Sequence, residues 1–294
     1  MDKYDYHRNV LAGSLRGKRT STIGLIVPDS ANPLFAEVSR AIEELVFKSD
    51  YSVVLCNSNY DFKRELEHID VLRSKKVDGI IIAPTTIQFE HINNLIDNNI
   101  PVVIIDRLVP GVKCDIVLID NYQGTFDSTK YLINLGHHDI GYIDRPFDLP
   151  HSLDRINGYK NALEQNKIEY RNDLVIRGGF NYEGGAKAME ILLGNKNPPS
   201  AVVAFNDIAA IGAMRYIKDK GLNIPNDISV VGFDDIFVSA FTIPRLTTVH
   251  FPKYRMAESA YNLLIKRING SISEPMKEVM LTLNLVIRES VSKH

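Results

Sequence analysis

This sequence has few cysteines, almost no net charge and no long apolar run, and each shortage narrows what the chain can be. Two cysteines in 294 residues form neither a disulfide framework nor a zinc site, so we expect buried free thiols in a reducing compartment. A formal net charge of -2 excludes a general binder of polyanions. No apolar run precedes Ile23 and none is long enough to cross a bilayer, so we expect a cytoplasmic protein with no secretory signal and no membrane partner.

The sequence also lacks the motifs of common enzymes. It has no glycine-rich phosphate loop of the Walker type, no nucleophile elbow and no cluster of metal ligands. The adjacent carboxylates of Asp234 and Asp235 would diverge at a strand end and could not flank a substrate. We therefore predict a protein that is not an enzyme and that holds neither a cofactor nor a metal.

Short apolar runs alternate with amphipathic segments along the whole chain. The runs are rich in β-branched residues and apolar on both faces, which is typical of strands in a parallel sheet. We expect strands at 23–27, 52–56, 79–83, 102–106, 116–119, 140–143, 174–176, 201–205, 229–232 and 279–287. We expect helices at 35–48, 64–74, 90–98, 125–135, 155–165, 183–193, 208–220 and 254–268. Left-handed caps are expected at the glycines that follow four of them: Gly136, Gly194, Gly221 and Gly270.

The series of strands and helices divides near Asp120 into two similar halves. Repeated alternation of this kind predicts an α/β fold with two doubly wound parallel-sheet lobes joined by a hinge. We expect a leading segment at 1–19, an N-terminal lobe at 20–119 plus 251–279, and a C-terminal lobe at 120–250 plus 280–294. Ligand is expected in the cleft at the carboxyl ends of the strands.

Several motifs, in a fixed order and spacing, resemble the lactose-repressor family of transcription regulators. They are RNVLAGSLRGKRTSTIGLIVPDSANPLFAEV, VDGIIIAP, PVVIIDR, SLDRINGY, AVVAFNDIAAIGAM, DISVVGFDD and LTTVHFP, and the match runs from about residue 8 to residue 288. The sensor core of that family is similar to the ribose-binding proteins, so the resemblance implies a periplasmic-binding-protein-like fold. It also implies a repressor core that dimerises, binds a small effector between its lobes and controls operator binding allosterically.

The segment 9–15 matches the family's hinge helix, which enters the DNA minor groove. By that resemblance Leu15 would wedge between base pairs and Arg16 would lie near the phosphates. In this chain only KYDYHRN matches the end of the family's DNA-reading headpiece, so we expect operator DNA as a partner only with an intact headpiece. The alternative for this short segment alone is a disordered leader.

Four candidate ligand residues follow strands of the first lobe. Asn32 could donate to and accept from a hydroxyl group, and Phe35 could stack on a ring, although a helix cap and ordinary packing explain the same two residues. Asp106 and Arg107 pair an acceptor with a rigid fork of donors, with a surface ion pair as the alternative. The ribose-binding proteins use the same Asp-Arg step.

In the second lobe the resemblance assigns ligand contacts to Arg155, Phe180, Asn206 and Asp234. The alternative for Arg155 is a solvated arginine on a helix. We expect Asp207 to cap the following helix and Asp235 to be structural. Gly158 is expected to allow close helix packing. In the crossover LTTVHFP, His250 and Phe251 are both candidates, and the sequence leaves open which of them faces the cleft.

This set of amides, charges and aromatic walls suits a small polyhydroxylated ring, and a pentose fits it best. A purine suits it less, because a purine would need more aromatic cover, although LTTVHFP resembles the purine repressors. Two alternatives stay open: a solute-binding protein that feeds a transporter, and a sensor without a headpiece that responds to a purine.

Overall fold

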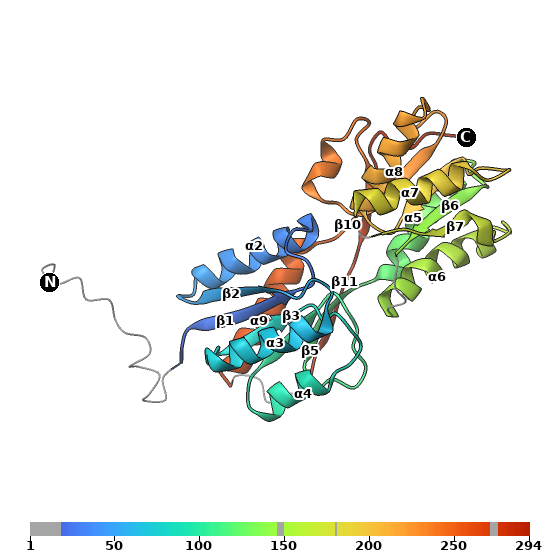
Figure 1. The fold of residues 1–294 in the computed structure, drawn as a ribbon. Helices are drawn as coiled ribbons and strands as arrows, with labels where there is room; N and C mark the ends of the chain where they lie inside the picture. The colour runs from blue at the N-terminus through green and yellow to red at the C-terminus, as the bar shows by residue number, and fades with distance from the viewer. Residues whose placement is uncertain (1–18, 146–149, 180, 271–275) are drawn as a thin grey trace, which may run out of the picture. The chain divides into compact units, whose positions relative to one another are not determined.

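A computed structural model describes residues 19–145, 150–179, 181–270 and 276–294 (Figure 1). The chain forms two compact units. Unit 1 holds the described residues up to Leu118 together with Lys253–Val279, and unit 2 holds Ile119–Pro252 together with Met280–His294. Each unit has its own six-stranded sheet, which confirms the predicted α/β class with two mostly parallel sheets.

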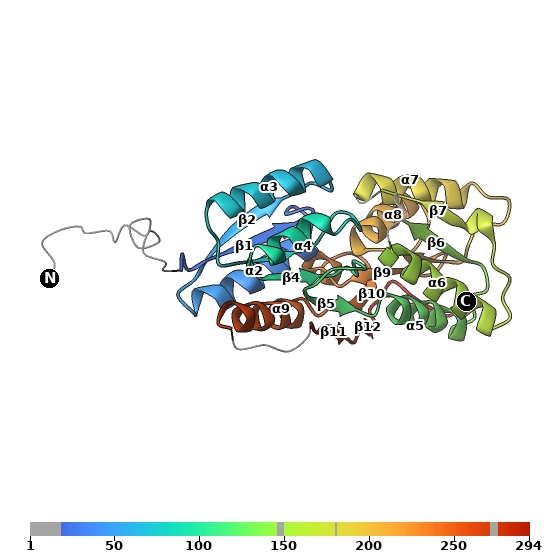
Figure 2. The same ribbon diagram turned by 90° about the horizontal axis from the view of Figure 1, so that it is seen from below.

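The sheet of unit 1 has the strand order β11-β5-β4-β3-β1-β2. Its strands are β1 (Thr22–Val27), β2 (Ser52–Asn57), β3 (Gly79–Ile82), β4 (Val102–Ile105), β5 (Asp115–Ile119) and β11 (Glu278–Leu281), and β1 to β5 are parallel. Its helices are α2 (Pro33–Phe47), α3 (Phe62–Ser74), α4 (Glu90–Asp97) and α9 (Lys253–Ile268). Figure 2 shows α3 and α4 on one face of the sheet and α2 and α9 on the other.

The sheet of unit 2 repeats this topology in the order β12-β10-β9-β8-β6-β7. Its strands are β6 (Ile140–Asp144), β7 (Val175–Arg177), β8 (Ala201–Ala204), β9 (Ser229–Asp234), β10 (Thr247–His250) and β12 (Asn284–Val286). The neighbours from β7 to β10 pair in parallel, and β12 pairs antiparallel with β10. Its helices are α5 (Asn121–Asn134), α6 (Pro150–Gln165), α7 (Tyr182–Leu193) and α8 (Asp207–Asp219), with short 3-10 turns η1 (Asn172–Leu174) and η2 (Phe237–Ala240).

Two local devices fix where the helices start and how closely they pack. A polar side chain accepts a hydrogen bond from the first turn of most helices, as Asp61 does for α3 and Asp120 does for α5. Between α5 and α6, a Cβ added at Gly158 would lie 2.3 Å from the Tyr122 carbonyl oxygen. The expected role of Gly158 in close helix packing is therefore confirmed.

The structure corrects three sequence expectations. The expected strand 279–287 is two strands, β11 and β12, which belong to different sheets. Strand β10 was not predicted, because its buried Thr247 and Thr248 make it look polar. Gly194 ends α7 with φ -77°, so its cap is right-handed, whereas the other three cap glycines have positive φ as predicted.

Both cysteines behave as predicted. Cys56 and Cys114 are buried free thiols. Burial raises the pKa of Cys114 to about 12, so this thiol stays protonated at neutral pH. No helix in the described part of the chain has the length and hydropathy to span a bilayer.

Candidate functional site

The first loop at the carboxyl edge of the unit 1 sheet carries Asn32 and Phe35. Asn32 follows β1 and caps α2, because its Oδ1 accepts from the Leu34 amide at 3.0 Å. The cap explanation for Asn32 is thus correct, and it leaves the side-chain NH2 group for other partners. Phe35 lies in the first turn of α2 and is buried.

Asp106 and Arg107 follow β4 at the same edge, and both are buried. The Arg107 guanidinium donates to the Pro84 carbonyl oxygen, and its Nε lies 3.8 Å from Asp106 Oδ2. Arg107 Nε is buried and has no hydrogen-bond partner in the described part of the chain. The pair is therefore no exposed surface ion pair, and it brings a carboxylate and a guanidinium together in a dry environment.

Tyr60 also belongs to this edge, and the sequence analysis did not find it. It follows β2, and both Asn59 (φ 52°) and Tyr60 (φ 56°) have left-handed backbone conformations. A bulky residue adopts this region only under strain, which is found most often at functional sites. The Tyr60 side chain is hydrogen-bonded to that of Asn32, and burial raises its pKa to about 12, opposed by the charge of Arg107. No sequence pattern predicts that a tyrosine has this strained backbone conformation.

Arg155 contacts several residues at the carboxyl edge of the unit 2 sheet. Its Nε donates to Asn121 Oδ1 at 2.7 Å, and another guanidinium nitrogen donates to the Phe205 carbonyl oxygen. A third nitrogen lies 3.7 Å from Asp234 Oδ1, and the guanidinium stacks 3.6 Å from the centre of the Phe233 ring. Arg155 is buried, so the expected alternative of a solvated helix arginine is wrong.

The structure corrects which of Asn206 and Asp207 caps helix α8. Asn206 caps α8, with its Oδ1 accepting from the Ala209 amide at 2.8 Å, so the prediction that Asp207 is the cap is wrong. Asp207 is fully buried and accepts from the Ile236 amide at 2.9 Å, Ser239 Oγ at 2.6 Å and Thr248 Oγ1 at 2.5 Å. Burial raises its pKa to about 6, partly offset by these hydrogen bonds.

Asp234 and its neighbours lie at the end of β9. Asp234 is buried with φ 110°, and Asp235 follows with φ 51°. Asp235 accepts from Arg288 at 2.6 Å and faces His250 Nδ1 at 2.8 Å, which makes it structural, as the sequence analysis also held. His250 is partly exposed and Phe251 is fully buried.

The two units place an aspartate at equivalent points. Strand β4 and strand β9 are each the fourth strand of their half and occupy the same position in the strand order. Asp106 directly follows β4 and Asp234 ends β9, and both have left-handed backbone conformations, with φ 69° and φ 110°. Each unit thus has one buried aspartate with a left-handed backbone at the carboxyl edge of its sheet.

Comparisons with known proteins agree with this geometry. A family model described as periplasmic binding protein-like domain matches residues 129–291. The HTH-type transcriptional repressor PurR of Vibrio atlanticus is 34% identical over 276 residues, covering 93% of this chain and 82% of the relative. The HTH-type transcriptional regulator DegA of Bacillus subtilis is 33% identical over 296 residues, covering 99% of this chain and 87% of the relative.

Solved structures of transcription regulators are also similar to this chain. A LacI family transcriptional regulator from Enterococcus faecium with bound ribose is similar with a TM-score of 0.84 and 31% identity, covering 93% of this chain and 99% of that one. The transcription regulator CcpA of Lactococcus lactis has a TM-score of 0.84 and 28% identity, covering 92% and 98%. This chain belongs to the LacI family. It is the effector-binding core of a transcriptional regulator, and these relatives do not favour the alternative of a transport receptor.

Three predicted residues of this LacI-family core lie outside the described residues: Leu15 and Arg16 of the hinge segment, and Phe180. The described residues contain no group of three or more His, Cys, Asp or Glu side chains that could hold a metal ion.

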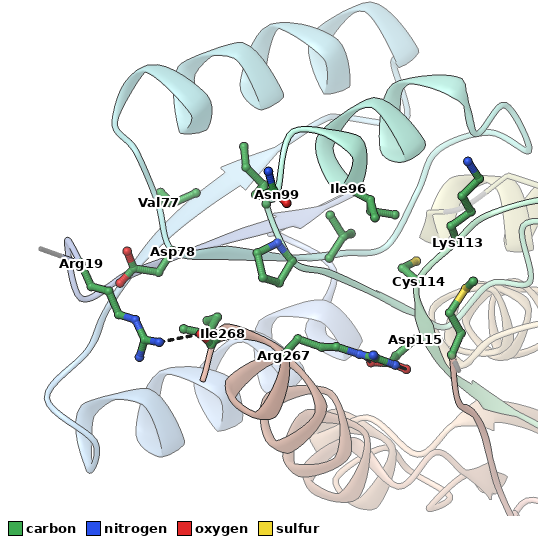
Figure 3. Close-up of a pocket in the computed structure, with 14 residues that line it drawn as sticks. Arg19, Val77, Asp78, Ile96, Asn99, Lys113, Cys114, Asp115, Arg267 and Ile268 are labelled. Carbon is green, nitrogen blue, oxygen red and sulfur yellow. Dashed lines mark hydrogen bonds and ion pairs between the residues drawn. The ribbon is translucent and has the colours of Figure 1, made fainter. Parts of the chain in front are cut away.

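A pocket of about 700 Å³ lies at the opposite edge of the unit 1 sheet, where β3, β4 and β5 begin (Figure 3). Its charged groups are already engaged. Arg19 donates to the Ile268 carbonyl oxygen at 2.6 Å, and Arg267 makes two 2.8 Å bonds to Asp115. Asp78 accepts from the Ser21 amide at 2.8 Å. The remaining charged side chain, Lys113, is exposed and lies 3.8 Å from Asp97 Oδ1. Among the described residues the pocket therefore offers a ligand no buried charge without a partner, unlike the carboxyl edge, where Arg107 Nε is buried and has no hydrogen-bond partner.

Proposed function

We propose that this LacI-family core senses a small sugar-like effector, with a pentose as the best fit, through residues at the carboxyl edges of both sheets. Unit 1 would contribute Asn32, Phe35, Asp106 and Arg107. Unit 2 would contribute Arg155, Phe180, Asn206, Asp234 and one or both of His250 and Phe251. The site would bind without chemistry on the ligand and would need no cofactor or metal.

The single observation that carries this proposal is the buried, left-handed aspartate at the equivalent strand end of each unit. Asp106 and Asp234 each have an arginine close by, at 3.8 Å for Arg107 and at 3.7 Å for Arg155. A carboxylate accepts from two hydroxyl groups and a guanidinium donates to their oxygens, which is the pairing that a polyhydroxylated ring requires. The structure of the Enterococcus faecium regulator with bound ribose supports a sugar of this size.

Effector binding would act on DNA through a shift of population. An effector that binds one arrangement of the two units more tightly favours that arrangement by its difference in affinity. In this proposal the shift sets whether the hinge segment with Leu15 and Arg16 engages operator DNA, and the protein acts as a repressor in the cytoplasm. Operator binding would require an intact DNA-reading headpiece.

We also propose that the core forms a homodimer through α2 and β2. Strand β2 is an edge of the unit 1 sheet, and Leu55 on it is 49% exposed. A groove of about 370 Å³ runs between α2 and β2 and is lined by Ala36, Arg40, Val53 and Leu55 among others. Sedimentation should find a dimer that Leu55→Lys weakens, whereas Val71→Lys, at a position on α3 that is 43% exposed, should leave it intact. A monomer in the unmodified chain would contradict the dimer.

The experiment that tests the effector is a thermal-shift screen against pentoses, hexoses, sugar phosphates and purines. A ligand that binds only the folded chain raises the melting temperature by mass action. A rise with one sugar, lost in Asp106→Asn and in Asp234→Asn, would support the proposal. A rise with a purine alone would contradict the sugar and favour the purine alternative.

A further inference from the structure

Glu65 is a fully buried carboxylate in the first turn of α3, and the ligand site described above does not use it. Its Oε2 accepts from the Thr85 amide at 2.7 Å, and its Oε1 lies 2.9 Å from His91 Nε2. A buried charge is costly unless it is paired and hydrogen-bonded. Glu65 has both kinds of partner, and they come from the loop after β3 and from α4.

The loop after β3 is the link between Glu65 and Arg107. Thr85 is buried, and its hydroxyl group has no hydrogen-bond partner in the described part of the chain. The bond from the Thr85 amide to Glu65 therefore fixes this point of the loop. The preceding residue is Pro84, whose carbonyl oxygen accepts from the Arg107 guanidinium. Glu65 is thus two hydrogen bonds and one peptide unit away from Arg107.

The His91 ring meets Glu65 through its Nε2 atom. His91 Nδ1 is buried and has no hydrogen-bond partner in the described residues. With a proton on Nε2, the imidazole donates to Glu65 Oε1. The ring also packs edge-on against Phe62 at 5.1 Å, which fixes its orientation.

We propose that Glu65 is a positioning residue for effector binding: it holds the loop after β3 so that the Pro84 carbonyl oxygen orients the Arg107 guanidinium. This inference rests on the proposed role of Arg107 in contacting the effector. Glu65 itself touches no effector in this proposal. Its carboxylate charge and its two hydrogen bonds set the direction in which Arg107 presents its remaining donors.

The first test needs no effector. NMR of the arginine Nε–H groups, with the Arg107 signal assigned by its loss in Arg107→Lys, is compared in the unmodified chain and in Glu65→Gln. We expect the Arg107 signal to shift or broaden in Glu65→Gln and the Thr85 amide to exchange faster. Glu67→Gln, the same change at an exposed position of α3, should alter neither signal. An unchanged Arg107 signal in a folded Glu65→Gln protein would overturn the proposal.

A second variant serves if Glu65→Gln does not fold. His91→Gln keeps the bond between Glu65 and the Thr85 amide, so it should change the Arg107 signal in the same way but less. An unchanged Arg107 signal in His91→Gln would overturn the proposal equally.

The second test uses D-ribose as the probe and a double-mutant cycle. Glu65→Gln should weaken D-ribose binding about tenfold, the scale of one misplaced hydrogen bond to a charged group. In the Arg107→Lys background the same change should cost nothing further, because the residue through which it acts is gone. An equal loss in both backgrounds would overturn the proposal. If the unmodified chain does not bind D-ribose, the choice of sugar fails, and the NMR comparison still decides the role of Glu65.

Discussion

The guanidinium of Arg155 lies 3.6 Å from the centre of the Phe233 ring, and Phe233 directly precedes Asp234 in β9. One strand end therefore supplies both the aromatic platform that holds Arg155 and the carboxylate 3.7 Å from it. Successive residues of a strand point to opposite sides, but the left-handed Asp234 breaks that alternation. The strained turn lets two neighbouring side chains meet the same guanidinium.

Replacement of Arg155 by methionine should separate its packing from its charge. Methionine keeps an apolar stem over Phe233, but it removes the hydrogen bonds to Asn121 Oδ1 and to the Phe205 carbonyl oxygen, and it removes the positive charge 3.7 Å from Asp234. We expect Arg155→Met to weaken binding of the sugar found in the thermal-shift screen at least about a hundredfold and to lower the free energy of unfolding by about 1–3 kcal/mol. Calorimetric titration and urea unfolding measure the two effects.

The matched control for Arg155→Met is Arg215→Met on α8. Arg215 makes an exposed ion pair with Asp219, so its loss should change neither binding nor stability by more than a few tenths of a kcal/mol. Full sugar affinity in Arg155→Met would remove Arg155 from the site.

Asp234 and Asp235 are neighbours that should respond in opposite ways to the same change. Asp234→Asn should weaken sugar binding by about 1.5–3 kcal/mol, the scale of a charged hydrogen bond, with little effect on folding. Asp235→Asn should mainly lower the free energy of unfolding, because Asp235 holds Arg288 at 2.6 Å and His250 at 2.8 Å. Titration and urea unfolding of both variants check this contrast, and a loss of affinity in Asp235→Asn alone would reverse our assignment.

Most of the fold was predictable because burial and helix capping leave clear patterns in the sequence. A strand such as β3, with its four buried residues GIII, is predicted directly by its apolar run, and glycines such as Gly136 and Gly221 mark where helices end. The prediction failed where tertiary contacts override the pattern. The Thr residues of β10 are polar, and they are buried because Thr248 donates to Asp207 and Thr247 accepts from the Arg288 amide.

The candidate site was predictable only where a strand ends in a charged or amide residue. Asp106, Arg107, Asn206 and Asp234 satisfy that rule, and the structure places each at the carboxyl edge of its own sheet. Tyr60 does not follow this rule. Its position depends on two consecutive residues with left-handed backbones, and nothing in the sequence predicts that conformation. For Arg155, the sequence could not reveal the partners on α5, just after β8 and on β9, since contacts so distant along the chain are visible only in three dimensions.

Tyr60 can be tested against its neighbour, because both residues have left-handed backbones. Glycine adopts this region without strain, so Asn59→Gly should leave sugar binding unchanged and should not lower stability. In Tyr60→Gly the relief of strain offsets the lost burial, so we expect a change in unfolding free energy within about 1 kcal/mol. Sugar affinity should nevertheless fall about tenfold, because the phenol bonded to Asn32 is gone. Equal affinities in the two variants would make the strain at Tyr60 unrelated to binding.

Asp207 should make the stability of the chain depend on pH in a direction unusual for an aspartate. Its pKa is raised from 3.8 to about 6 in the folded state, chiefly by burial. Between these values the folded chain binds more protons than the unfolded chain, so this group lowers the free energy of unfolding as the pH rises. The stabilisation is fully present below about pH 4 and is lost as the pH passes about 6.

Urea unfolding of the unmodified chain and of Asp207→Asn across this range isolates the effect. The asparagine cannot ionise, so the difference in unfolding free energy between the two proteins should change by roughly 2 kcal/mol between pH 4 and pH 6.5. Asp219→Asn, at the exposed end of the same helix, should track the unmodified chain. Parallel curves for the unmodified chain and Asp207→Asn would mean that Ser239, Thr248 and the Ile236 amide offset the cost of burial completely, and that Asp207 is ionised throughout the range.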